Sequence, residues 1–331
     1  MARRLQLLRA PRAAGGLGLK LAVEIAGLRL KNPLLAASGT FGYGVELEGI
    51  VDLEVLGGLV TKGLYLEPRE GCPSPRIVET PSGLLNAIGL QGIGVRAFVR
   101  DVLPRLARHD TAVLVNVCGD TVEEYAEVTH ILDGSAGVAG VEINISCPNV
   151  RKGGMAFGGD PRMTAEVVGA VRKATRLPVI PKLSPNVADI TVFARAAAEA
   201  GADALSCVNT FLGLAIDVET RRPRLAFGTG GLSGPAIRPL AVRMAWQVAR
   251  AVRIPVIGIG GISSARDALE FLIAGCRAVQ IGTANFLDPG VYERILADLR
   301  EYLERHGLDD VNAVVGTLDY SAPAPVEETC T

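Results

Sequence analysis

Short apolar runs alternate with segments of helical periodicity along most of this chain. The runs have strand length and consist mainly of Val, Ile, Leu and Ala, as expected for strands that a parallel sheet buries on both faces. The segments between them are long enough to serve as helical crossovers. The eight predicted strands are Leu34–Ser38, Leu59–Gly63, Ala112–Val117, Gly140–Ser146, Val179–Leu183, Ala204–Asn209, Val256–Gly260 and Ala278–Gly282. The predicted helices include Thr121–Leu132, Pro161–Thr175, Ala188–Ala200, Pro235–Val252 and Ala265–Ala274.

This alternation predicts one α/β domain with the (β/α)8 architecture of a TIM barrel. The alternative is a doubly wound open sheet, which would normally carry a G-x-G-x-x-G dinucleotide fingerprint after its first strand. Two glycine-rich stretches come near that pattern, but each has a serine, Ser233 or Ser263, where the third glycine belongs. Periodicity alone does not exclude the open sheet, and the missing fingerprint favours the barrel.

Two segments fall outside the repeating pattern. Val23–Lys31 predicts a short N-terminal β-hairpin with its turn at Ala26-Gly27. The stretch between Thr210 and Pro235, after the sixth strand, is too long for an ordinary connection. It predicts an insertion that forms a lid or a packing arm.

The N-terminal segment differs in composition from the rest of the chain. Residues 1–20 carry no acidic side chain and several basic ones, namely Arg3, Arg4, Arg9, Arg12 and Lys20. Such a stretch faintly resembles a transit peptide or a membrane-surface arm, and a poorly ordered basic extension is the simpler expectation. We therefore place the barrel domain in residues 21–310 and expect a C-terminal tail at 311–331.

Charge and composition narrow the function classes. The chain has 331 residues, and its 34 Lys and Arg nearly balance its 35 Asp and Glu, so nothing attracts it globally to nucleic acid or acidic membranes. No stretch approaches the roughly 20 consecutive apolar residues of a membrane helix. Six scattered cysteines form no C-x-x-C pair, which is typical of reduced thiols in a cytosolic protein. We expect a cytoplasmic protein without a nucleic-acid or membrane partner.

Polar residues occur at the carboxyl ends of most predicted strands, where the loops of a barrel converge on one face. Any one Asn or Ser there could simply cap a helix or make a turn. Two lysines, Lys62 and Lys182, are harder to explain in that way, because a buried ammonium without a partner is costly. They indicate an anionic or electron-rich ligand. The polar strand ends are Ser38, Thr61-Lys62-Gly63, Asn116, Asn144 to Asn149, Lys182 with Ser184, and Asn209-Thr210.

The last two predicted strands end in small residues, Gly260-Gly261 and Gly282-Thr283. In many barrels the loops after the seventh and eighth strands bind phosphate through bare backbone N–H groups. Glycine at either end alone could equally mark a turn. The two pairs together favour a phosphorylated ligand.

Cys147 is the best candidate for a catalytic side chain among the six thiols. It follows a predicted strand within Asn144-Ile-Ser-Cys147-Pro-Asn149, where Pro148 fixes the backbone of the loop. We expect neither a metal site nor a Ser-His-Asp triad, because none of the three histidines lies at ligand spacing from a cysteine or an acid. Three other cysteines are interpreted as small buried hydrophobes: Cys118, Cys207 and Cys276.

These residues stand in a series of motifs that closely resembles the dihydroorotate dehydrogenase family. The resemblance runs in order from about Leu21 to about Gly307. After Leu90 the chain reads Gln-Gly92-Ile-Gly94, where the family usually has Gln-Asn-Pro-Gly. The motifs are Ala37-Ser38-Gly-Thr-Phe-Gly-Tyr-Gly44, Thr61-Lys62-Gly63, Asn86-Ala-Ile-Gly89-Leu90, Asn144-Ile-Ser-Cys147-Pro-Asn149, Lys182-Leu-Ser-Pro-Asn186, Asn209-Thr210, Leu232-Ser-Gly-Pro235, Gly260-Gly261-Ile and Gly282-Thr283.

The resemblance implies an FMN cofactor at the mouth of the barrel and a planar pyrimidine substrate beside it. Asparagine presents a donor and an acceptor together, which suits the imide-like edge of such a ring. For the phosphate of FMN the resemblance implies Gly260, Gly261, Gly282 and Thr283. Its other implied cofactor contacts are Ser38, Lys62, Gly63, Asn116, Asn144, Lys182, Val208 and Gly234. Its implied substrate contacts are Lys62, Asn86, Ala87, Ile88, Gly89, Leu90, Asn144, Asn209 and Thr210.

The resemblance also implies the reaction, which is the oxidation of (S)-dihydroorotate to orotate in pyrimidine biosynthesis. Cys147 would accept a proton while a hydride passes to N5 of FMN. A cysteine base resembles the soluble class 1 branch of the family. The Lys-Leu-Ser-Pro-Asn and Gly-Leu-Ser-Gly-Pro-Ala stretches resemble its heteromeric, NAD-linked subtype. That subtype implies a partner subunit with FAD and an iron–sulfur cluster, and either a homodimer or a heterotetramer.

Two other interpretations stay open on the sequence. A related FMN barrel that acts on another dihydropyrimidine, as in the C-terminal part of dihydropyrimidine dehydrogenase, also carries a catalytic cysteine. The other interpretation is a barrel that binds flavin without catalysis. The joint occurrence of Lys62, Asn144, Cys147 and Lys182 argues against the latter.

Overall fold

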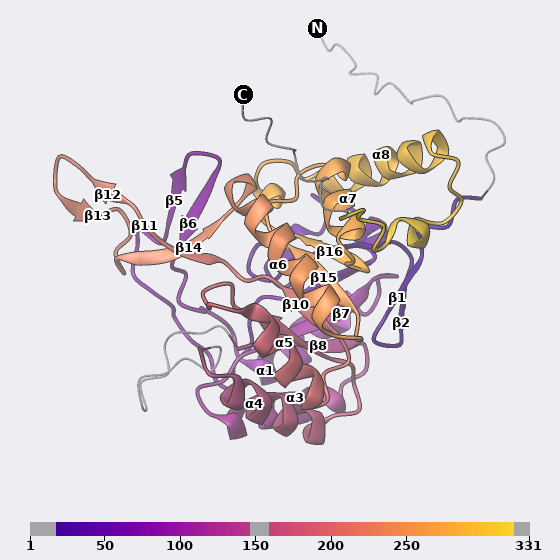
Figure 1. Ribbon diagram of the computed structural model, residues 1–331. Coiled ribbons are helices and arrows are strands. Elements are labelled where there is room, and N and C mark those ends of the chain that lie inside the picture. Colours follow the sequence, from indigo (N-terminus) through magenta and orange to yellow (C-terminus); the bar gives the residue numbers. More distant parts are fainter. Residues whose placement is uncertain (1–17, 146–158, 321–331) are drawn as a thin grey trace, which may run out of the picture.

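The chain folds into a closed barrel of eight parallel strands surrounded by helices (Figure 1). The structure is a computed structural model and describes residues 18–145 and 159–320. The strands follow one another around the barrel in chain order, and the last pairs with the first. The predicted (β/α)8 architecture is therefore confirmed, and the open sheet is excluded. The barrel strands are β3 (Leu34–Ala36), β4 (Gly58–Val60), β7 (Ala112–Val117), β8 (Gly140–Asn144), β9 (Val179–Leu183), β10 (Leu205–Cys207), β15 (Val256–Ile259) and β16 (Ala278–Ile281).

The barrel strands are apolar because helices cover their outer face and side chains fill the interior. Every residue of β3, β4, β9, β10, β15 and β16 is buried. This burial explains why short continuous apolar runs located the strands in the sequence. A few buried side chains of the barrel strands are polar, namely Asn116, Glu142, Lys182, Ser206 and Gln280.

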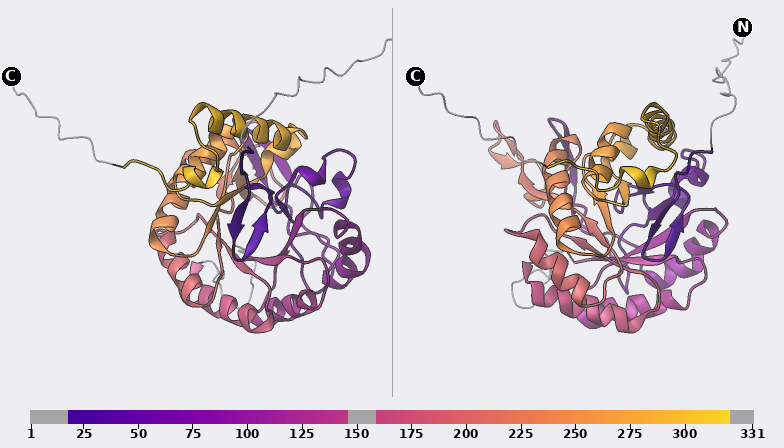
Figure 2. Two further views of the ribbon diagram at one scale, coloured as in Figure 1. Left: turned by 90° about the vertical axis from the view of Figure 1, so that its right-hand side faces the viewer. Right: turned by 45° about the vertical axis from the view of Figure 1, so that its right-hand side comes forward.

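Helices surround the barrel on its outside (Figure 2). Side-chain caps start several of them: the Thr121 hydroxyl accepts from Glu124 N at 3.2 Å, and Ser264 accepts from Asp267 N at 3.3 Å. Four of the five predicted helical segments agree with the structure within two residues at each end, whereas the predicted Pro235–Val252 begins three residues before its α-helix, because Pro235–Ile237 forms a 3-10 turn. The α-helices are α1 (Val95–Ala97), α2 (Leu103–Leu106), α3 (Val122–Asp133), α4 (Pro161–Ala174), α5 (Ile190–Glu199), α6 (Arg238–Ala251), α7 (Ala265–Ile273) and α8 (Val291–Arg305). The shorter helical elements are η1 (Val45–Leu47), η2 (Leu53–Val55), η3 (Phe98–Val102), η5 (Pro235–Ile237), η6 (Thr283–Phe286) and η7 (Val311–Val314).

A second, antiparallel sheet of strand order β11-β14-β6-β5 joins two excursions from the barrel. The insertion after the sixth barrel strand is confirmed, and it supplies β11 (Phe211–Leu214) and β14 (Thr229–Ser233), with the small hairpin β12 (Ile216–Asp217) and β13 (Arg222–Pro223) between them. Its partner excursion, β5 (Ile77–Thr80) and β6 (Gly83–Asn86), was not predicted. We refer to this four-stranded sheet as the cap sheet.

The first and last segments of the barrel domain, around Lys20 and Asp310, pack against each other. The predicted N-terminal hairpin is confirmed as β1 (Val23–Ile25) and β2 (Leu28–Leu30), with Ala26 and Gly27 at positive φ in its turn. Lys20 Nζ lies 2.7 Å from Asp310 Oδ2, and Val311 is buried, so packing continues past residue 310. Within the described ranges, no helix is both long enough and apolar enough to cross a bilayer.

Candidate active site

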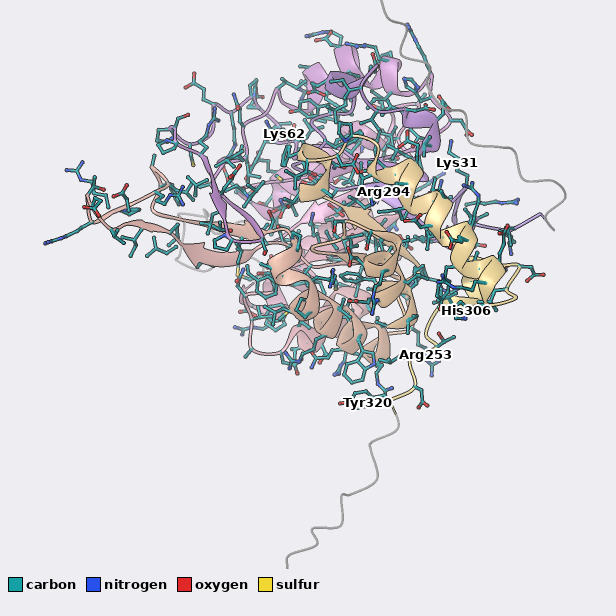
Figure 3. The ribbon with its side chains drawn as sticks, turned by 90° about the horizontal axis from the view of Figure 1, so that it is seen from above. Lys31, Lys62, Arg253, Arg294, His306 and Tyr320 are labelled. Carbon is teal, nitrogen blue, oxygen red and sulfur yellow. The ribbon has the colours of Figure 1, made fainter. Side chains whose placement is uncertain are left out.

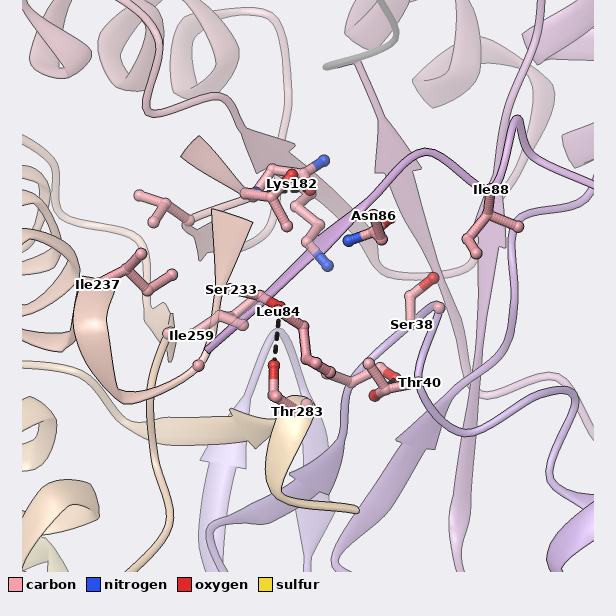
Figure 4. Close-up of a pocket in the computed structure, with 18 of the residues that line it drawn as sticks. Ser38, Thr40, Leu84, Asn86, Ile88, Lys182, Ser233, Ile237, Ile259 and Thr283 are labelled. Atoms are coloured by element: carbon pink, nitrogen blue, oxygen red, sulfur yellow. Dashed lines mark hydrogen bonds between the residues drawn. The ribbon is translucent and has the colours of Figure 1, made fainter. Parts of the chain in front are cut away.

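The carboxyl ends of the barrel strands and the cap sheet enclose one cavity (Figure 4). Most residues predicted for the site line it, and they come from the ends of all eight barrel strands, from β6 and from the segment after β14. Two further predicted residues, Ala87 and Gly89, line an adjoining cavity that shares Asn86 and Asn144 with the first. Cys147 lies outside the described residues. The predicted residues in the first cavity are Ser38, Lys62, Gly63, Asn86, Ile88, Leu90, Asn116, Asn144, Lys182, Val208, Asn209, Thr210, Gly234, Gly260, Gly261, Gly282 and Thr283.

Lys62 brings a half-buried ammonium to the cavity from the end of β4. Its backbone N–H donates to the Gly42 carbonyl at 2.7 Å, which fixes the loop that carries it. Burial lowers the pKa of Lys62 from its ordinary value of 10.5, while the Glu46 carboxylate raises this pKa and the Arg76 guanidinium lowers it. An anionic group bound in the cavity would meet a cation that is only partly hydrated.

Three asparagines, from β6, from β8 and from the segment after β10, line both cavities. Asn209 Nδ2 donates to Asn144 Oδ1 at 3.3 Å, and Asn209 Oδ1 accepts from the backbone of Thr210 at 2.9 Å. Tyr125 Oη holds the Asn144 carbonyl at 2.7 Å, and Asn86 Nδ2 donates to the Gly231 carbonyl of β14 at 3.2 Å. These contacts fix the amides in place and leave them further hydrogen-bonding capacity for a ligand.

Lys182 and Asn116 line the cavity from β9 and β7, and both are buried. Each contacts the same carboxylate below the cavity. Asn116 Nδ2 donates to Glu142 Oε1 at 2.9 Å, and Lys182 Nζ lies 3.6 Å from that oxygen. The buried Lys182 ammonium thus lies beside a buried carboxylate, which limits the free-energy cost of removing both charges from water.

The ends of β15 and β16 bring small residues to the opposite side of the cavity. Gly260 and Gly261 have φ of 137° and 71°, which favour glycine. A Cβ on Gly260 would lie 2.6 Å from Ala241 Cβ of α6, so the chain passes too close to this helix for a side chain. Thr283 Oγ1 donates to Ser233 Oγ at 2.8 Å, tying β16 to the cap sheet (Figure 4). The backbone of both strand ends is therefore held at the cavity edge.

Comparison with known proteins identifies the family. The family model for dihydroorotate dehydrogenase matches residues 20–303. This chain belongs to the dihydroorotate dehydrogenase family. The resemblance to this family that was drawn from the motifs is therefore confirmed.

Curated relatives from this family cover nearly the whole chain. Proteins from Geobacter sp. (strain M21) and Geobacter sulfurreducens are 56% and 59% identical to it over 299 residues, which are 90% of this chain and 98% of each relative. A relative from Desulforudis audaxviator is 59% identical over 297 residues, covering 90% of this chain and 97% of its own. All three are described as "Dihydroorotate dehydrogenase B (NAD(+)), catalytic subunit".

A solved structure supports the same fold. The crystal structure of DHODH in complex with ferulenol from Eimeria tenella superposes with a TM-score of 0.76 at 21% sequence identity. It covers 93% of this chain and 91% of the solved chain. At this identity the likeness shows the barrel fold of the dehydrogenase alone.

Three buried thiols of this dehydrogenase family member are poor candidates for chemistry. Cys118, Cys207 and Cys276 are buried, as predicted. Burial raises the pKa of Cys207 and of Cys276, so both stay protonated at neutral pH. Cys72 is partly exposed and lines the adjoining cavity.

Several residues of the dehydrogenase cavity escaped the sequence analysis. Glu142 does not line the cavity but lies below it, in the middle of the apolar strand β8. The signal for it was an acid inside an apolar run. The cavity-lining residues that were missed include Thr40, Ser233, Ile237, Ile259 and Phe286. Thr40 and Ser233 lie within motifs of the family resemblance but were not singled out, while Ile237, Ile259 and Phe286 carry no charge or motif that would distinguish them from ordinary packing residues.

Proposed function

We propose that this chain oxidises (S)-dihydroorotate to orotate in pyrimidine biosynthesis, with FMN as its cofactor. The observation that carries the proposal is the single cavity that combines Lys62 and Lys182 with the amides of Asn144 and Asn209. The printed names of the relatives, which describe dihydroorotate dehydrogenase B catalytic subunits, support the same activity. Two cations and several amides suit a substrate that carries a carboxylate on an imide-containing ring.

The donor set of the cavity fits FMN. Gly260, Gly261, Gly282 and Thr283 offer backbone at two adjacent strand ends, the usual position of a barrel phosphate site. When bound there, FMN supplies the acceptor for the hydride that leaves the substrate. The residues that would contact its ring and ribityl chain are Ser38, Lys62, Gly63, Asn116, Asn144, Lys182, Val208 and Gly234.

The substrate would be held by groups of the chain itself. Lys62 would pair with the carboxylate, while Asn144 and Asn209, already joined at 3.3 Å, would hydrogen-bond the ring edge. The segment from Asn86 to Leu90 would cover it, together with Thr210. Cys147 would accept the proton from the carbon next to a ring carbonyl, as the hydride leaves the neighbouring carbon.

We further propose that the electrons leave through a partner subunit. The relatives are named catalytic subunits of an NAD(+)-linked enzyme, which supports a heteromeric assembly. A partner with FAD and an iron–sulfur cluster would connect FMN to NAD, in a cytoplasmic heterotetramer built on a homodimer of this chain.

The cofactor assignment is tested by its release. The purified chain is expected to be yellow and to release FMN, not FAD, after acid denaturation, because the four strand-end residues form one monophosphate site. Chromatography of the released flavin against both standards makes the measurement. A colourless protein that does not take up added FMN would contradict the proposal.

Orotate binding is expected to weaken as the pH rises. Lys62 must carry its proton to pair with the carboxylate, as we expect at neutral pH. Because the pKa of Lys62 is lowered from 10.5, the pairing should be lost on raising the pH, at a lower pH than that at which a free lysine deprotonates. Lys62→Met should weaken binding about tenfold to a hundredfold at neutral pH, as expected for a lost charge-assisted hydrogen bond, and should flatten the pH dependence. Spectral titration of the flavin with orotate from neutral to alkaline pH measures both.

Lys31→Met is the matched control for the lysine experiment. Lys31 lies on a different part of the molecule from Lys62 (Figure 3), and its Nζ is 3.2 Å from Asp110 Oδ2. It should bind orotate as the unmodified protein does. A pH dependence that persists in Lys62→Met would assign the effect to another group.

A further inference from the structure

A carboxylate lies inside the barrel at the meeting point of five strands. Glu142 of β8 is fully buried, and its two oxygens accept hydrogen bonds from side chains of β7, β10 and β16. Asn116 Nδ2 donates to Oε1 at 2.9 Å, while Ser206 Oγ and Gln280 Nε2 donate to Oε2 at 2.8 and 2.6 Å. Lys182 of β9 completes the group, with its Nζ 3.6 Å from Oε1.

The side chains around Glu142 present hydrogen-bond donors to it. All of its partners present N–H or O–H donors, and a protonated carboxyl would turn a donor of its own toward one of them. This arrangement therefore suits a carboxylate. An isolated buried carboxylate would be very costly, and Lys182 supplies the compensating charge.

The residues around Glu142 form two layers, and only one of the layers lines the cavity. Asn116 and Lys182 line the cavity, whereas Glu142, Ser206 and Gln280 are buried below it. The carboxylate thus contacts the two residues that would contact a flavin, and it does not line the cavity itself. Because Asn116 Nδ2 donates to Glu142, the NH2 end of the Asn116 amide points away from the cavity.

We propose that Glu142 is a positioning residue that holds the Lys182 ammonium and the Asn116 amide, and thereby sets the reduction potential of the bound flavin. The proposal rests on the proposed function, because it assumes that a flavin occupies the cavity. Reduction adds negative charge to the flavin, and a nearby ammonium stabilises that charge. Glu142 offsets part of the Lys182 charge, so it keeps the potential lower than Lys182 alone would.

The test is a potentiometric titration of the FMN-loaded protein and its variants. E142Q removes the negative charge that lies 3.6 Å from the Lys182 ammonium, so the potential is expected to rise. The ratio of reduced to oxidised flavin at a fixed potential should increase about tenfold or more, and each tenfold corresponds to about 30 mV for a two-electron couple. E142D, which keeps the charge, should stay nearer to the unmodified protein. A potential that is unchanged or lower in E142Q overturns the proposal.

A second pair of variants tests whether Lys182 carries the effect. In the K182M background, E142Q should shift the potential by much less than it does alone. An equal shift would mean that Glu142 acts on the flavin directly, and the positioning role would be wrong. Asn32→Ala is the control for the loss of a buried polar side chain. Asn32 precedes β3 at the other end of the barrel, where it donates to the Val55 carbonyl and accepts from Leu34 N. This substitution should lower stability without moving the potential.

Chemical unfolding of the cofactor-free proteins gives a readout that needs no flavin. E142Q removes the buried carboxylate beside the Lys182 ammonium, so it should be less stable than the double variant E142Q/K182M, in which both charges are gone. Stability losses that simply add would show that the two residues are not coupled, which contradicts the proposal. If the unmodified protein binds no FMN, the proposed function fails, and this unfolding cycle still decides whether Glu142 and Lys182 act as a pair.

Discussion

Replacing Cys147 with alanine is expected to slow the reduction of the bound flavin by dihydroorotate by about two to four orders of magnitude, the usual contribution of a positioned general base. The substrate must lose a proton as the hydride leaves, and the motif places Cys147 three positions after Asn144, an amide of the cavity. Cys147→Ser retains a group that can accept the proton and should be milder. Anaerobic stopped-flow measurement of flavin bleaching gives the rate directly.

The thiol experiment needs a control that removes a cysteine without approaching the substrate. Cys276→Ala serves, because Cys276 is buried in the core before β16, at the other end of the barrel strand from the cavity. It should reduce its flavin at a rate close to that of the unmodified protein. Equal rates in Cys147→Ala and the unmodified protein would assign the base to another residue, and rapid reduction by dihydrouracil would favour a different dihydropyrimidine as substrate.

The isolated chain is expected to pass electrons from dihydroorotate to dyes or oxygen, with NAD reduction at background level. The glycine-rich stretches lack a complete dinucleotide fingerprint, and the cysteines lack the clustered spacing of common iron–sulfur sites. NAD reduction should appear when the electron-transfer subunit is added, and the two proteins should co-purify after joint expression. Parallel assays with a dye and with NAD, with and without the partner, make the comparison.

The dye assay is the internal control for the NAD experiment, because it reports the first half of the reaction in every sample. Activity with the dye but not with NAD would support the partner. Efficient reduction of NAD or fumarate by this chain alone would contradict the heteromeric assembly and leave the dehydrogenase activity standing.

The barrel could be predicted from the sequence because its strands are buried on both faces. The run Val179–Leu183, apolar apart from Lys182, has no exposed position to interrupt it, and the predicted bounds match β9. Part of the cap sheet has no such continuous run of buried apolar residues. In β5 exposed and half-buried residues alternate, and Ile77 is 47% exposed although it is apolar. β5 pairs with its hairpin neighbour β6, and β6 in turn pairs with β14 of the distant insertion, which a local pattern does not reveal.

Charge at strand ends located most of the candidate site. Lys62 and Lys182 stood out because a lysine is rarely placed beside apolar runs, and both line the cavity. Glu142 was missed because it lies within a strand, and its partners come from distant parts of the chain. Period two in β8 puts Glu142 on the same face as Asn144, which would have indicated an inward side chain. The hydrogen-bond partners themselves could be known only from the closed barrel.

The cap sheet joins segments that are far apart along the chain, and this separation bears on the order of folding. Asn86 of β6 and Gly231 of β14 are in register although they lie 145 positions apart. Closing so long a loop costs conformational entropy that a few strand pairs do not recover on their own. The barrel strands between them must first bring β6 and β14 to the same side. We therefore expect the floor of the pocket to form before its cover, so that the contacts that enclose the ligand form last in folding.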